Sequence, residues 1–353
     1  MSITKVGMTD KFRVGITNDF LTSGGESAFG DIGLGMFDAE SGLSHDFFSE
    51  YHAEATPEQL ENIDAVITLY PQFNDHNLAR AERLTLIARF GVGYDMIDVD
   101  ACTRNDVILA ITPEGVRRGM AEGALTLMLA LAKQVFPKSQ LLRAGRWYDS
   151  KSVLGCCLTD KTIGTIGLGN IGGDLMRLVA SFQPARRLAY DPHCPPEQAM
   201  ALGVELVDLD TVLRESDFVS IHCLLNDETR GLIGERELNL MKSTAFLVNT
   251  ARGPIIDQRA LTTALAERTI RGAALDVFEV EPVEMNDPLL ELDNLIALPH
   301  SVGGTQELLL GNGRGACQAV LDVFHGRAPQ HVVNQEVLKR PGLQQKLARY
   351  ANP

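Results

Sequence analysis

Residues 162–182, TIGTIGLGNIGGDLMRLVASF, constrain the fold more than any other segment of the chain. A β-branched run leads into Gly167, Gly169 and Gly172, which have G-x-G-x-x-G spacing, and an amphipathic helical pattern follows. The first glycine allows a tight turn, the second lets a phosphate approach the backbone, and the third lets the helix pack on the strand. Glycine triplets alone are common, but with this strand and this helix the segment is typical of a dinucleotide-binding βαβ unit.

Short apolar runs alternate with helical patterns along most of the chain. From residue 161 onward these runs are nearly continuous in apolar residues, as in strands buried on both faces of a parallel sheet. An earlier set, beginning with FRVGIT and ending with VILAI, predicts a second and smaller α/β unit. A chain of 353 residues has room for two domains with well-filled cores. We therefore predict a doubly wound α/β fold in two parts.

Three other segments carry local signals. A helical pattern runs from about Gly115 to Ala144 and contains Pro137, which we expect to break or kink the helix. Residues 22–42 are rich in glycine and predict a loop. The tail beyond His331 is polar and carries no clear pattern.

An acidic residue follows the next predicted strand after the glycine loop. In LAYDP, Asp191 ends that strand. A carboxylate at this place accepts hydrogen bonds from the adenosine ribose and disfavours a 2′-phosphate, which favours NAD over NADP. An Asp before Pro192 is also a common turn pairing, so a purely structural role stays open. His193 would weaken the preference for NAD only if it were protonated.

Three polar side chains follow three other predicted strands. Arg252 ends FLVNTAR, Glu281 follows GAALDVFE, and His300 ends LIALPH. An isolated arginine usually forms a surface salt bridge, but a guanidinium beside a core is costly unless an anion meets it. Because ligands bind at the carboxyl ends of strands in open parallel sheets, we expect these residues to meet at one site.

Four segments, taken together with their order and spacing along the chain, give a more specific signal: TIGTIGLGNIG, FLVNTARGPIID, GAALDVFEVEP and LIALPHSVGGT. Together they resemble the signatures of the D-isomer-specific 2-hydroxyacid dehydrogenase family. The similarity runs from about Gly91 to Thr305 and is thin across the first ninety residues.

The resemblance implies two Rossmann-like, doubly wound parallel-sheet domains with an active-site cleft between them. The substrate-binding, flavodoxin-like domain would be discontinuous, with residues 1–114 plus 304–353, and the NAD-binding Rossmann domain would comprise residues 115–303. Family members commonly pair through the cofactor domain, and the helical stretch from Gly115 is apolar, so we expect a homodimer.

The resemblance also implies roles for individual residues. Arg252 would bind the carboxylate and keto oxygen of the substrate, and His300, paired with Glu281, would be the acid and base. The residue chemistry agrees, because guanidinium offers a bidentate fork, imidazole exchanges a proton near neutral pH, and a carboxylate stabilises imidazolium. The implied substrate-binding residues are Val92, Gly93, Arg252 and His300. The implied cofactor-binding residues are Gly167, Gly169, Asn170, Ile171, Gly172, Asp191, His222, Thr250, Ala251, Asp276 and Gly303.

Several of these positions have a structural alternative. Asp276 resembles the residue that contacts the nicotinamide carboxamide, yet it could simply cap the end of a strand. His222 matches a position under the adenosine, but a packed core histidine is nearly as good an interpretation. Arg117 and Arg118 depart from the family pattern, and could either contact an anion or begin a helix at its polar face.

The loop LYPQFND departs from phosphoglycerate-type members of the family, which carry an arginine there. Here the loop contains Tyr70, Pro71 and Phe73, and we expect no C-terminal regulatory domain. Both features count against a phosphorylated substrate.

Composition excludes several other classes of partner. The formal charge is −14, from 32 basic and 46 acidic residues that form no acidic block, which argues against nucleic acid and anionic membrane surfaces. No run approaches the length of a membrane span, and the first residues lack the apolar core of a signal peptide. The six cysteines form no C-x-x-C pair, which favours reduced thiols and a cytoplasmic location. The eight histidines show no metal-binding spacing, so we expect no metal site.

The function that we predict is NAD-dependent hydride transfer between nicotinamide and C2 of a D-2-hydroxy acid or 2-keto acid. A formate dehydrogenase-like enzyme is one alternative, but that enzyme pairs its histidine with glutamine, and Glu281 therefore counts against it. An NAD(H)-sensing, corepressor-like binding protein on the same fold is another. Such a protein would need the nucleotide site, but it would not need the set of Arg252, Glu281 and His300.

Overall fold

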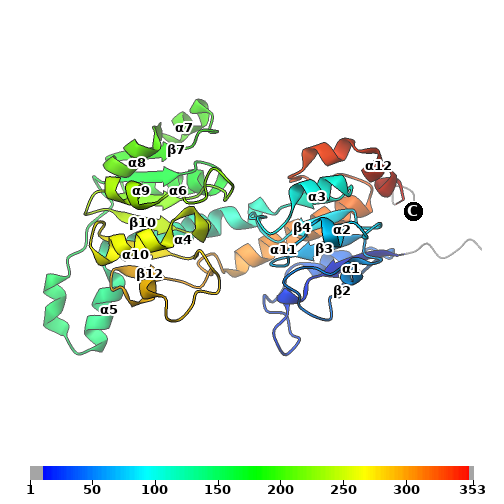
Figure 1. Cartoon of the computed structure of the whole chain (residues 1–353), viewed down its shortest axis with the longest axis horizontal. Helices are drawn as coiled ribbons and strands as arrows, with labels where there is room; N and C mark the ends of the chain where they lie inside the picture. Colours follow the sequence, from blue (N-terminus) through cyan, green and yellow to red (C-terminus); the bar gives the residue numbers. More distant parts are fainter. Residues whose placement is uncertain (1–10, 350–353) are drawn as a thin grey trace, which may run out of the picture. The chain divides into compact units, whose positions relative to one another are not determined.

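The computed structural model describes residues 11–349, which fall into two compact units (Figure 1). One unit comprises the described parts of Met1–Val116 and Thr305–Pro353, and the other comprises Arg117–Gly304. Each is built on a single parallel sheet, with five strands in the first unit and seven in the second. The predicted α/β fold with two Rossmann-like parallel sheets is therefore confirmed.

The sheet of the first unit has the strand order β2-β1-β3-β4-β5. Its strands are β1 (Phe12–Ile16), β2 (Leu43–Phe47), β3 (Ala65–Thr68), β4 (Leu86–Arg89) and β5 (Ile108–Ala110). The predicted apolar runs correspond to all of them except β2, whose sequence LSHDF is polar at its centre and only partly buried at the edge of the sheet. Within the sheet β2 pairs only with β1, and this pairing forms a strand that the sequence of β2 does not indicate by itself.

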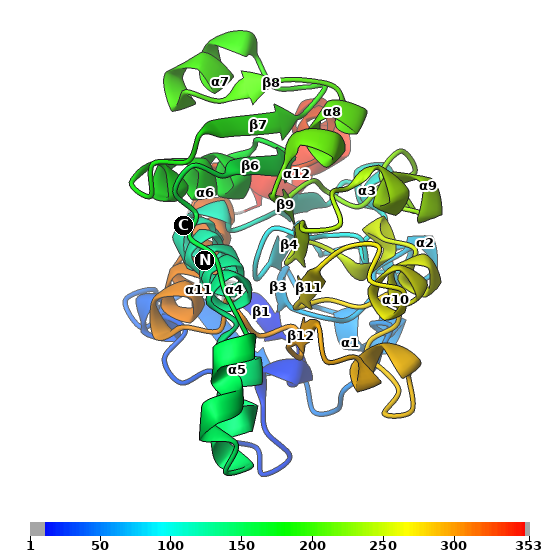
Figure 2. The ribbon, with the colours of Figure 1, turned by 90° about the vertical axis from the view of Figure 1, so that its left-hand side faces the viewer.

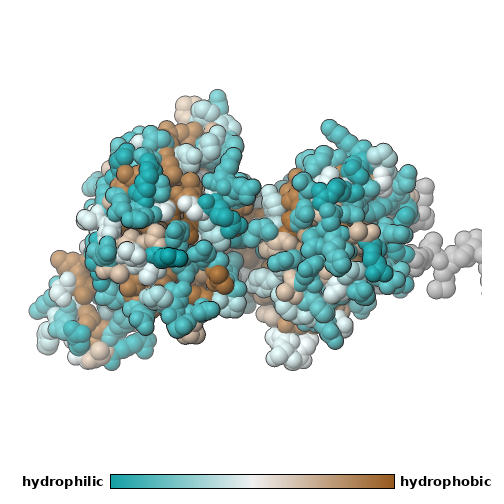
Figure 3. Space-filling model, viewed as in Figure 1, coloured by the Kyte–Doolittle hydropathy of each residue, from teal (hydrophilic) through white to brown (hydrophobic). Residues whose placement is uncertain are grey.

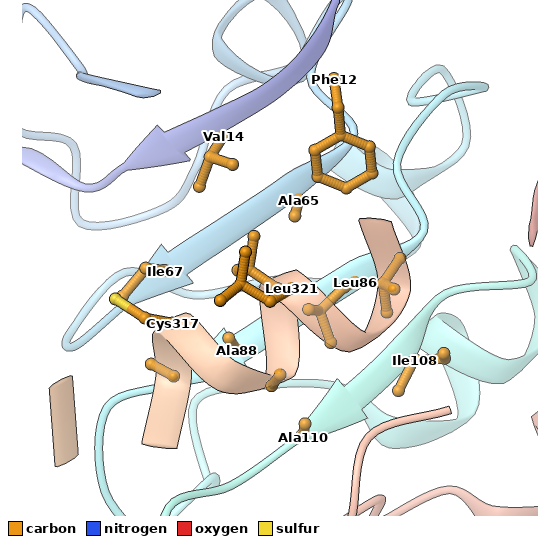
Figure 4. Packing of buried hydrophobic residues seen from close by; sticks show 14 of the residues in the cluster. Phe12, Val14, Ala65, Ile67, Leu86, Ala88, Ile108, Ala110, Cys317 and Leu321 are labelled. Atoms are coloured by element: carbon orange, nitrogen blue, oxygen red, sulfur yellow. The ribbon is translucent and has the colours of Figure 1, made fainter. Parts of the chain in front are cut away.

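Helices cover both faces of this sheet. The helices of the first unit are α1 (Pro57–Leu60), α2 (Asp75–Leu78), α3 (Val99–Arg104), α11 (Gln306–Phe324) and α12 (Pro341–Ala348), with 3₁₀ helices η1 (Asn18–Phe20), η2 (Leu34–Phe37) and η6 (Gln335–Lys339). Side chains alternate between the faces, so Ala65 and Ile67 belong to the same hydrophobic cluster as Cys317 of α11 (Figure 4). Val66 belongs to a separate cluster on the opposite face.

The sheet of the second unit has the strand order β12-β11-β10-β9-β6-β7-β8. Its strands are β6 (Thr162–Ile166), β7 (Arg186–Tyr190), β8 (Glu205–Leu206), β9 (Phe218–Ile221), β10 (Phe246–Asn249), β11 (Gly272–Leu275) and β12 (Leu295–Ala297). Each lies within a run that the sequence predicted as a strand. The order reverses between β6 and β9, and such a reversal is where a doubly wound sheet opens a ligand crevice.

The helices of the second unit also form two layers. They are α4 (Pro113–Lys133), which begins in the first unit, α5 (Val135–Arg143), α6 (Asn170–Ala180), α7 (Pro196–Leu202), α8 (Leu209–Glu215), α9 (Glu235–Leu240) and α10 (Gln258–Ala266), with 3₁₀ helices η3 (Trp147–Ser152), η4 (Gly253–Ile255) and η5 (Pro288–Glu291). Helices α4, α6 and α7 lie on one side of the sheet and α8, α9 and α10 on the other (Figure 2). One hydrophobic cluster contains residues of the first three helices, and a second contains residues of the other three.

The long predicted helix breaks at a different residue from the one expected. Gln134 adopts a left-handed conformation with φ of 54° between α4 and α5. Pro137 lies in the first turn of α5, where a missing N–H costs no helical hydrogen bond, so the prediction of a break at the proline was wrong.

The polar tail beyond His331 is ordered against the first unit. Val332 forms an antiparallel bridge with Ala110 of β5, and the buried Asn334 accepts a hydrogen bond from the Leu109 N–H. In α12, the buried Lys346 donates hydrogen bonds to three backbone carbonyls, and burial lowers its pKa to about 8. Val332, Val337, Leu343 and Leu347 are also buried in the core of this unit. The polar residues between them leave no regular apolar pattern in the sequence, so docking of this segment could not be predicted.

In residues 11–349, no helix is long and apolar enough to cross a membrane. The same part of the chain contains no group of three or more His, Cys, Asp or Glu side chains that could hold a metal ion. The six cysteines are all free thiols.

Candidate active site

Three neighbouring strands of the second unit present the polar residues singled out in the sequence. Arg252 follows β10, Glu281 follows β11 and His300 follows β12, and these strands are adjacent in the sheet. The structure brings the three side chains together: Glu281 and His300 are hydrogen-bonded, and the charge of Arg252 acts on Glu281.

The Glu281–His300 contact defines how the imidazole is oriented. His300 Nδ1 lies 2.8 Å from Glu281 Oε2, and the two side chains are 40% and 36% exposed. His300 has a positive φ of 50°, which is uncommon for a residue with a Cβ. Since Nδ1 faces the carboxylate, Nε2 is the ring nitrogen available to a bound molecule.

Glu281 is held as a carboxylate by its surroundings. Burial by itself would raise its pKa, but the hydrogen bonds from His300 and the Phe278 N–H, with the nearby charge of Arg252, lower the pKa overall. The Phe278 N–H donates to Oε1 over 2.9 Å, so each carboxylate oxygen has a partner. The arrangement therefore favours an anion beside the imidazole.

Asn249, which the sequence analysis did not single out, shapes the turn that carries Arg252. Its side chain is fully buried, its Nδ2 donates to the Arg252 carbonyl over 2.9 Å, and its Oδ1 accepts from the Ala251 N–H over 3.0 Å. The half-buried Arg252 also donates from Nη1 to the Ala251 carbonyl. An asparagine closing an otherwise apolar strand was the available signal for this role.

Gly253 joins the Arg252 turn to the loop that carries Glu281. A Cβ at position 253 would lie 1.9 Å from both the carbonyl carbon and the oxygen of Phe278. Gln258 ties the same loop down, because its Oε1 accepts from the Glu279 N–H and its Nε2 donates to Asp287. The two loops are thus in direct backbone contact, and only glycine fits between them.

Replacing Gly253 with alanine should separate these loops. The clash is with backbone atoms that cannot rotate away, so we expect a loss of about 1–3 kcal/mol in the free energy of unfolding. A displacement of this size at the site should also lower kcat/KM about 100-fold. Denaturant unfolding and steady-state kinetics would measure both. Gly234→Ala is the control, since a Cβ there meets only ordinary contacts; equal behaviour of the two variants would contradict the prediction.

Asp276 supports the segment that follows His300. Its buried carboxylate accepts hydrogen bonds from the N–H groups of Ser301 and Val302, at 2.7 and 3.0 Å from Oδ1. Burial raises its pKa, and these hydrogen bonds partly oppose that effect. Asp276 therefore does cap the end of a strand, which was the structural alternative for this residue. Contact with a nicotinamide stays a prediction.

The glycine loop lies where the strand order of the second unit reverses. Gly167 has φ of +94°, and a Cβ there would come within 2.7 Å of the Cys223 nitrogen, just after β9. A Cβ on Gly172 would lie 2.2 Å from the Gly167 oxygen, so this glycine lets α6 approach the turn. Around Gly169 a Cβ would meet nothing within 4 Å. The loop therefore leaves open space at the N-terminus of α6, as a bound pyrophosphate requires.

Asp191 contacts the glycine loop directly. Its Oδ2 accepts from the Leu168 N–H over 2.7 Å, and its Oδ1 accepts from the His193 N–H over 2.9 Å. Asp191 therefore stabilises the local turn, which was the structural alternative to a contact with the ribose. A carboxylate has about four acceptor positions, so two remain for ribose hydroxyl groups.

His222 is half-buried after β9, and its Nε2 lies 2.8 Å from Ser220 Oγ. Burial lowers its pKa to about 4, which makes it a neutral group near pH 7. Thr250 is buried after β10, and its Oγ1 has no hydrogen-bond partner among the described residues. A buried hydroxyl without a partner is costly, and its presence fits a polar group bound at this edge of the sheet.

The remaining positions lie on both units. Asn170 and Ile171 begin α6, Ala251 precedes Arg252, and Gly303 is buried shortly after His300. Val92 and Gly93 belong to the first unit and are half-buried after β4. Arg117 is exposed, whereas Arg118 forms an ion pair with Asp174.

Comparison with known proteins gives consistent results. The model of the D-isomer specific 2-hydroxyacid dehydrogenase NAD-binding domain matches residues 125–302. Glyoxylate reductase of Korarchaeum cryptofilum is 37% identical over 293 residues, which cover 81% of this chain and 88% of that protein. D-3-phosphoglycerate dehydrogenase of Methanocaldococcus jannaschii is 41% identical over 258 residues, 73% of this chain but only 49% of that protein. A crystal structure of a glyoxylate reductase from Paecilomyes thermophila has a TM-score of 0.79 and 28% identity, and the match covers 92% of this chain and 99% of that one.

Proposed function

Because this chain belongs to the D-isomer specific 2-hydroxyacid dehydrogenases, and is thus an oxidoreductase with an NAD(P)-binding domain, we propose that it reduces a small 2-keto acid with NADH. Arg252, Glu281 and His300 carry the reaction in this proposal. The observation that supports it most strongly is the Glu281–His300 hydrogen bond beside the charge of Arg252, at the carboxyl ends of adjacent strands.

Substrate binding begins with the carboxylate. The Arg252 guanidinium pairs with it through charge-assisted hydrogen bonds and fixes the direction of the C1–C2 bond. The backbone at Val92 and Gly93 is proposed to complete carboxylate binding. The Asn249 and Gly253 contacts described above hold Arg252 in place during this step.

Proton transfer is assigned to His300. When bound, NADH supplies the hydride that C2 receives. His300 Nε2–H donates a proton to the keto oxygen, and in the reverse direction the neutral ring accepts the proton of the hydroxyl group. Glu281 accepts the hydrogen bond from Nδ1 and stabilises the imidazolium form.

Cofactor binding is proposed for residues 115–303 and substrate binding for residues 1–114 with 304–353. Within the cofactor part, Gly167, Gly169 and Gly172 would hold the pyrophosphate at the N-terminus of α6. The match of the family model to residues 125–302 supports this division.

We predict that NADH is preferred over NADPH by about tenfold or more in kcat/KM. The Asp191 carboxylate repels a 2′-phosphate at close range. In Asp191→Asn, the acceptor for the Leu168 N–H is kept while the charge is lost, so the preference should shrink. Initial rates with both cofactors would measure it. Equal use of NADH and NADPH by the wild-type protein would contradict the role of Asp191.

Glyoxylate is the first substrate to test, because the similar proteins of this length are named glyoxylate reductases. The loop with Tyr70 and Phe73 contains no arginine for a phosphate group, which favours small or uncharged substituents on C2. NADH oxidation should be measured with glyoxylate, hydroxypyruvate, pyruvate and bulkier 2-keto acids, and NAD reduction with formate. Turnover of a keto acid supports the proposal. Turnover of formate alone, or NADH binding without any turnover, would replace it with one of the two alternatives.

A homodimer is proposed through the segment that follows α4. Helix α5 has no buried residue, and large apolar side chains gather over it (Figure 3). The exposed apolar residues of this segment are Val135, Phe136, Leu142, Trp147, Tyr148 and Leu154. So many in one short stretch exceed the scattered exposure that is normal on a monomer.

Sedimentation should therefore give twice the chain mass of 38.5 kDa. The double variant Phe136→Glu/Trp147→Glu should sediment as a single chain, because charges would be buried at the interface. Met200→Glu is the control, since Met200 is an exposed apolar residue on α7. A wild-type protein of single-chain mass would contradict the dimer.

A cytoplasmic location is part of the proposal. The six free cysteines support it, because secreted chains usually pair such residues in disulfides.

A further inference from the structure

A carboxylate is buried on the helix that follows the glycine loop. Asp174 lies on α6, and its side chain is only 3% exposed. Within residues 11–349, its Oδ2 has no hydrogen-bond partner. An anion buried in this way is costly, and it is retained only where opposite charge compensates it.

Two arginines provide that compensation without forming hydrogen bonds to it. Arg118 of α4 places Nε 3.3 Å from Asp174 Oδ2, and Arg177 of α6 places Nη1 3.6 Å from Oδ1. Both guanidinium side chains are more than half exposed. The exposed Glu122 is a weaker partner of Arg118, at 3.9 Å. The cluster thus has a buried negative centre and a positive outer side.

This cluster lies close to the proposed pyrophosphate site. Asp174 is four residues after Asn170, the first residue of α6, so it lies about 6 Å along the axis from the helix N-terminus. The first turn of α6 contains no acidic residue, which leaves Asp174 as the nearest anion on the helix. A phosphate bound beyond the helix end would lie farther away, and at about 10 Å, with an effective dielectric constant of about 20, a unit charge changes the binding of another charge about tenfold.

We propose that Asp174, balanced by Arg118 and Arg177, sets the affinity of α6 for the dinucleotide pyrophosphate. The buried carboxylate opposes the bound anion, and the arginines cancel this effect. Asp174 thereby limits how tightly the cofactor is held, and Arg118 keeps binding strong enough for turnover. The inference rests on the proposed cofactor site in the glycine loop. It gives Arg118, which departs from the family pattern, an electrostatic role without direct contact to substrate.

The test is a mutant cycle read by NADH binding, measured as nucleotide fluorescence in the full-length protein. Asp174→Asn should bind NADH about tenfold more tightly than wild type, and Arg118→Met about tenfold more weakly. The double variant should return close to the wild-type affinity. Glu122→Gln is the matched control, because it removes an exposed carboxylate beside Arg118, and this variant should bind NADH with the wild-type affinity. ADP should follow the same pattern as NADH, whereas adenosine, which lacks the pyrophosphate, should not.

A merely structural ion pair predicts a different result. Loss of either partner would then lower Tm and leave NADH affinity unchanged or weaker in both single variants. Tighter binding by Asp174→Asn supports the proposal, and unchanged or weaker binding by that folded variant overturns it. If Asp174→Asn does not fold, the Arg118→Met variant decides: weaker binding of NADH and ADP with unchanged binding of adenosine supports the proposal, and any other pattern overturns it. A wild-type protein that binds neither NADH nor ADP would overturn this inference and the proposed function together, whereas normal wild-type binding with unchanged variants overturns this inference alone.

Discussion

Replacing Arg252 with alanine is expected to lower kcat/KM for glyoxylate about a thousandfold while NADH binding stays intact. The guanidinium makes two charge-assisted hydrogen bonds to the substrate carboxylate in the proposed complex, each contributing about 1.5–3 kcal/mol. Its loss also frees the substrate to rotate away from the cofactor, so KM should rise and kcat should fall. Initial rates over a range of glyoxylate concentrations would separate the two effects.

Two further variants sharpen this prediction. Arg252→Lys keeps the charge but not the planar fork, and should recover only part of the lost activity. Arg259→Ala removes an exposed arginine of α10 and should leave the kinetics unchanged. Turnover by Arg252→Ala at the wild-type rate would remove Arg252 from the site.

His300→Gln is expected to lower kcat by about 10²–10⁴-fold, the usual contribution of a general acid or base. Glutamine can still form a hydrogen bond but cannot deliver a proton to the keto oxygen. The matched control is His325→Gln, because His325 also lies beside a carboxylate, 3.2 Å from Glu40, but in the first unit at the end of α11. An unchanged rate constant for keto-acid reduction by His300→Gln, measured in a single turnover, would contradict the role of His300 as the proton donor.

The pH profile tests the partner of His300. The lowered pKa of Glu281 keeps its carboxylate charged through neutral and mildly acidic pH, where it stabilises imidazolium. In Glu281→Gln this anion is lost, so the pH at which reduction is fastest should move to a lower value and the rate at neutral pH should fall. An unchanged profile would show that the hydrogen bond is only structural.

Much of the fold could be predicted from local patterns. Strands buried on both faces of a parallel sheet read as continuous apolar runs, and this identified β1, β3 and β6 alike. β2 was missed because its sequence is polar and the neighbouring strand supplies the stabilisation. The break at Gln134 is set by a left-handed backbone at a residue with no strong preference for it, so Pro137 gave a misleading signal.

Some residues of the candidate site could likewise be predicted from the sequence, and others could not. Motif spacing and strand ends placed Arg252, Glu281 and His300 together, because parallel strands end at one edge of a sheet. The role of Gly253 depends on a backbone approach from a loop more than twenty residues away, which no local pattern encodes. Asp174 was read only as part of a helix, since its burial beside Arg118 arises from packing between α4 and α6.

Hydride transfer itself can be followed with NADH that carries deuterium at both C4 positions and with hydroxypyruvate as the acceptor. Wild-type protein is expected to form glycerate of the D configuration with the label at C2, and Arg252→Ala and His300→Gln should form it at a far lower rate. Unlabelled product, product of the opposite configuration, or labelled product formed equally well by these variants would contradict this prediction.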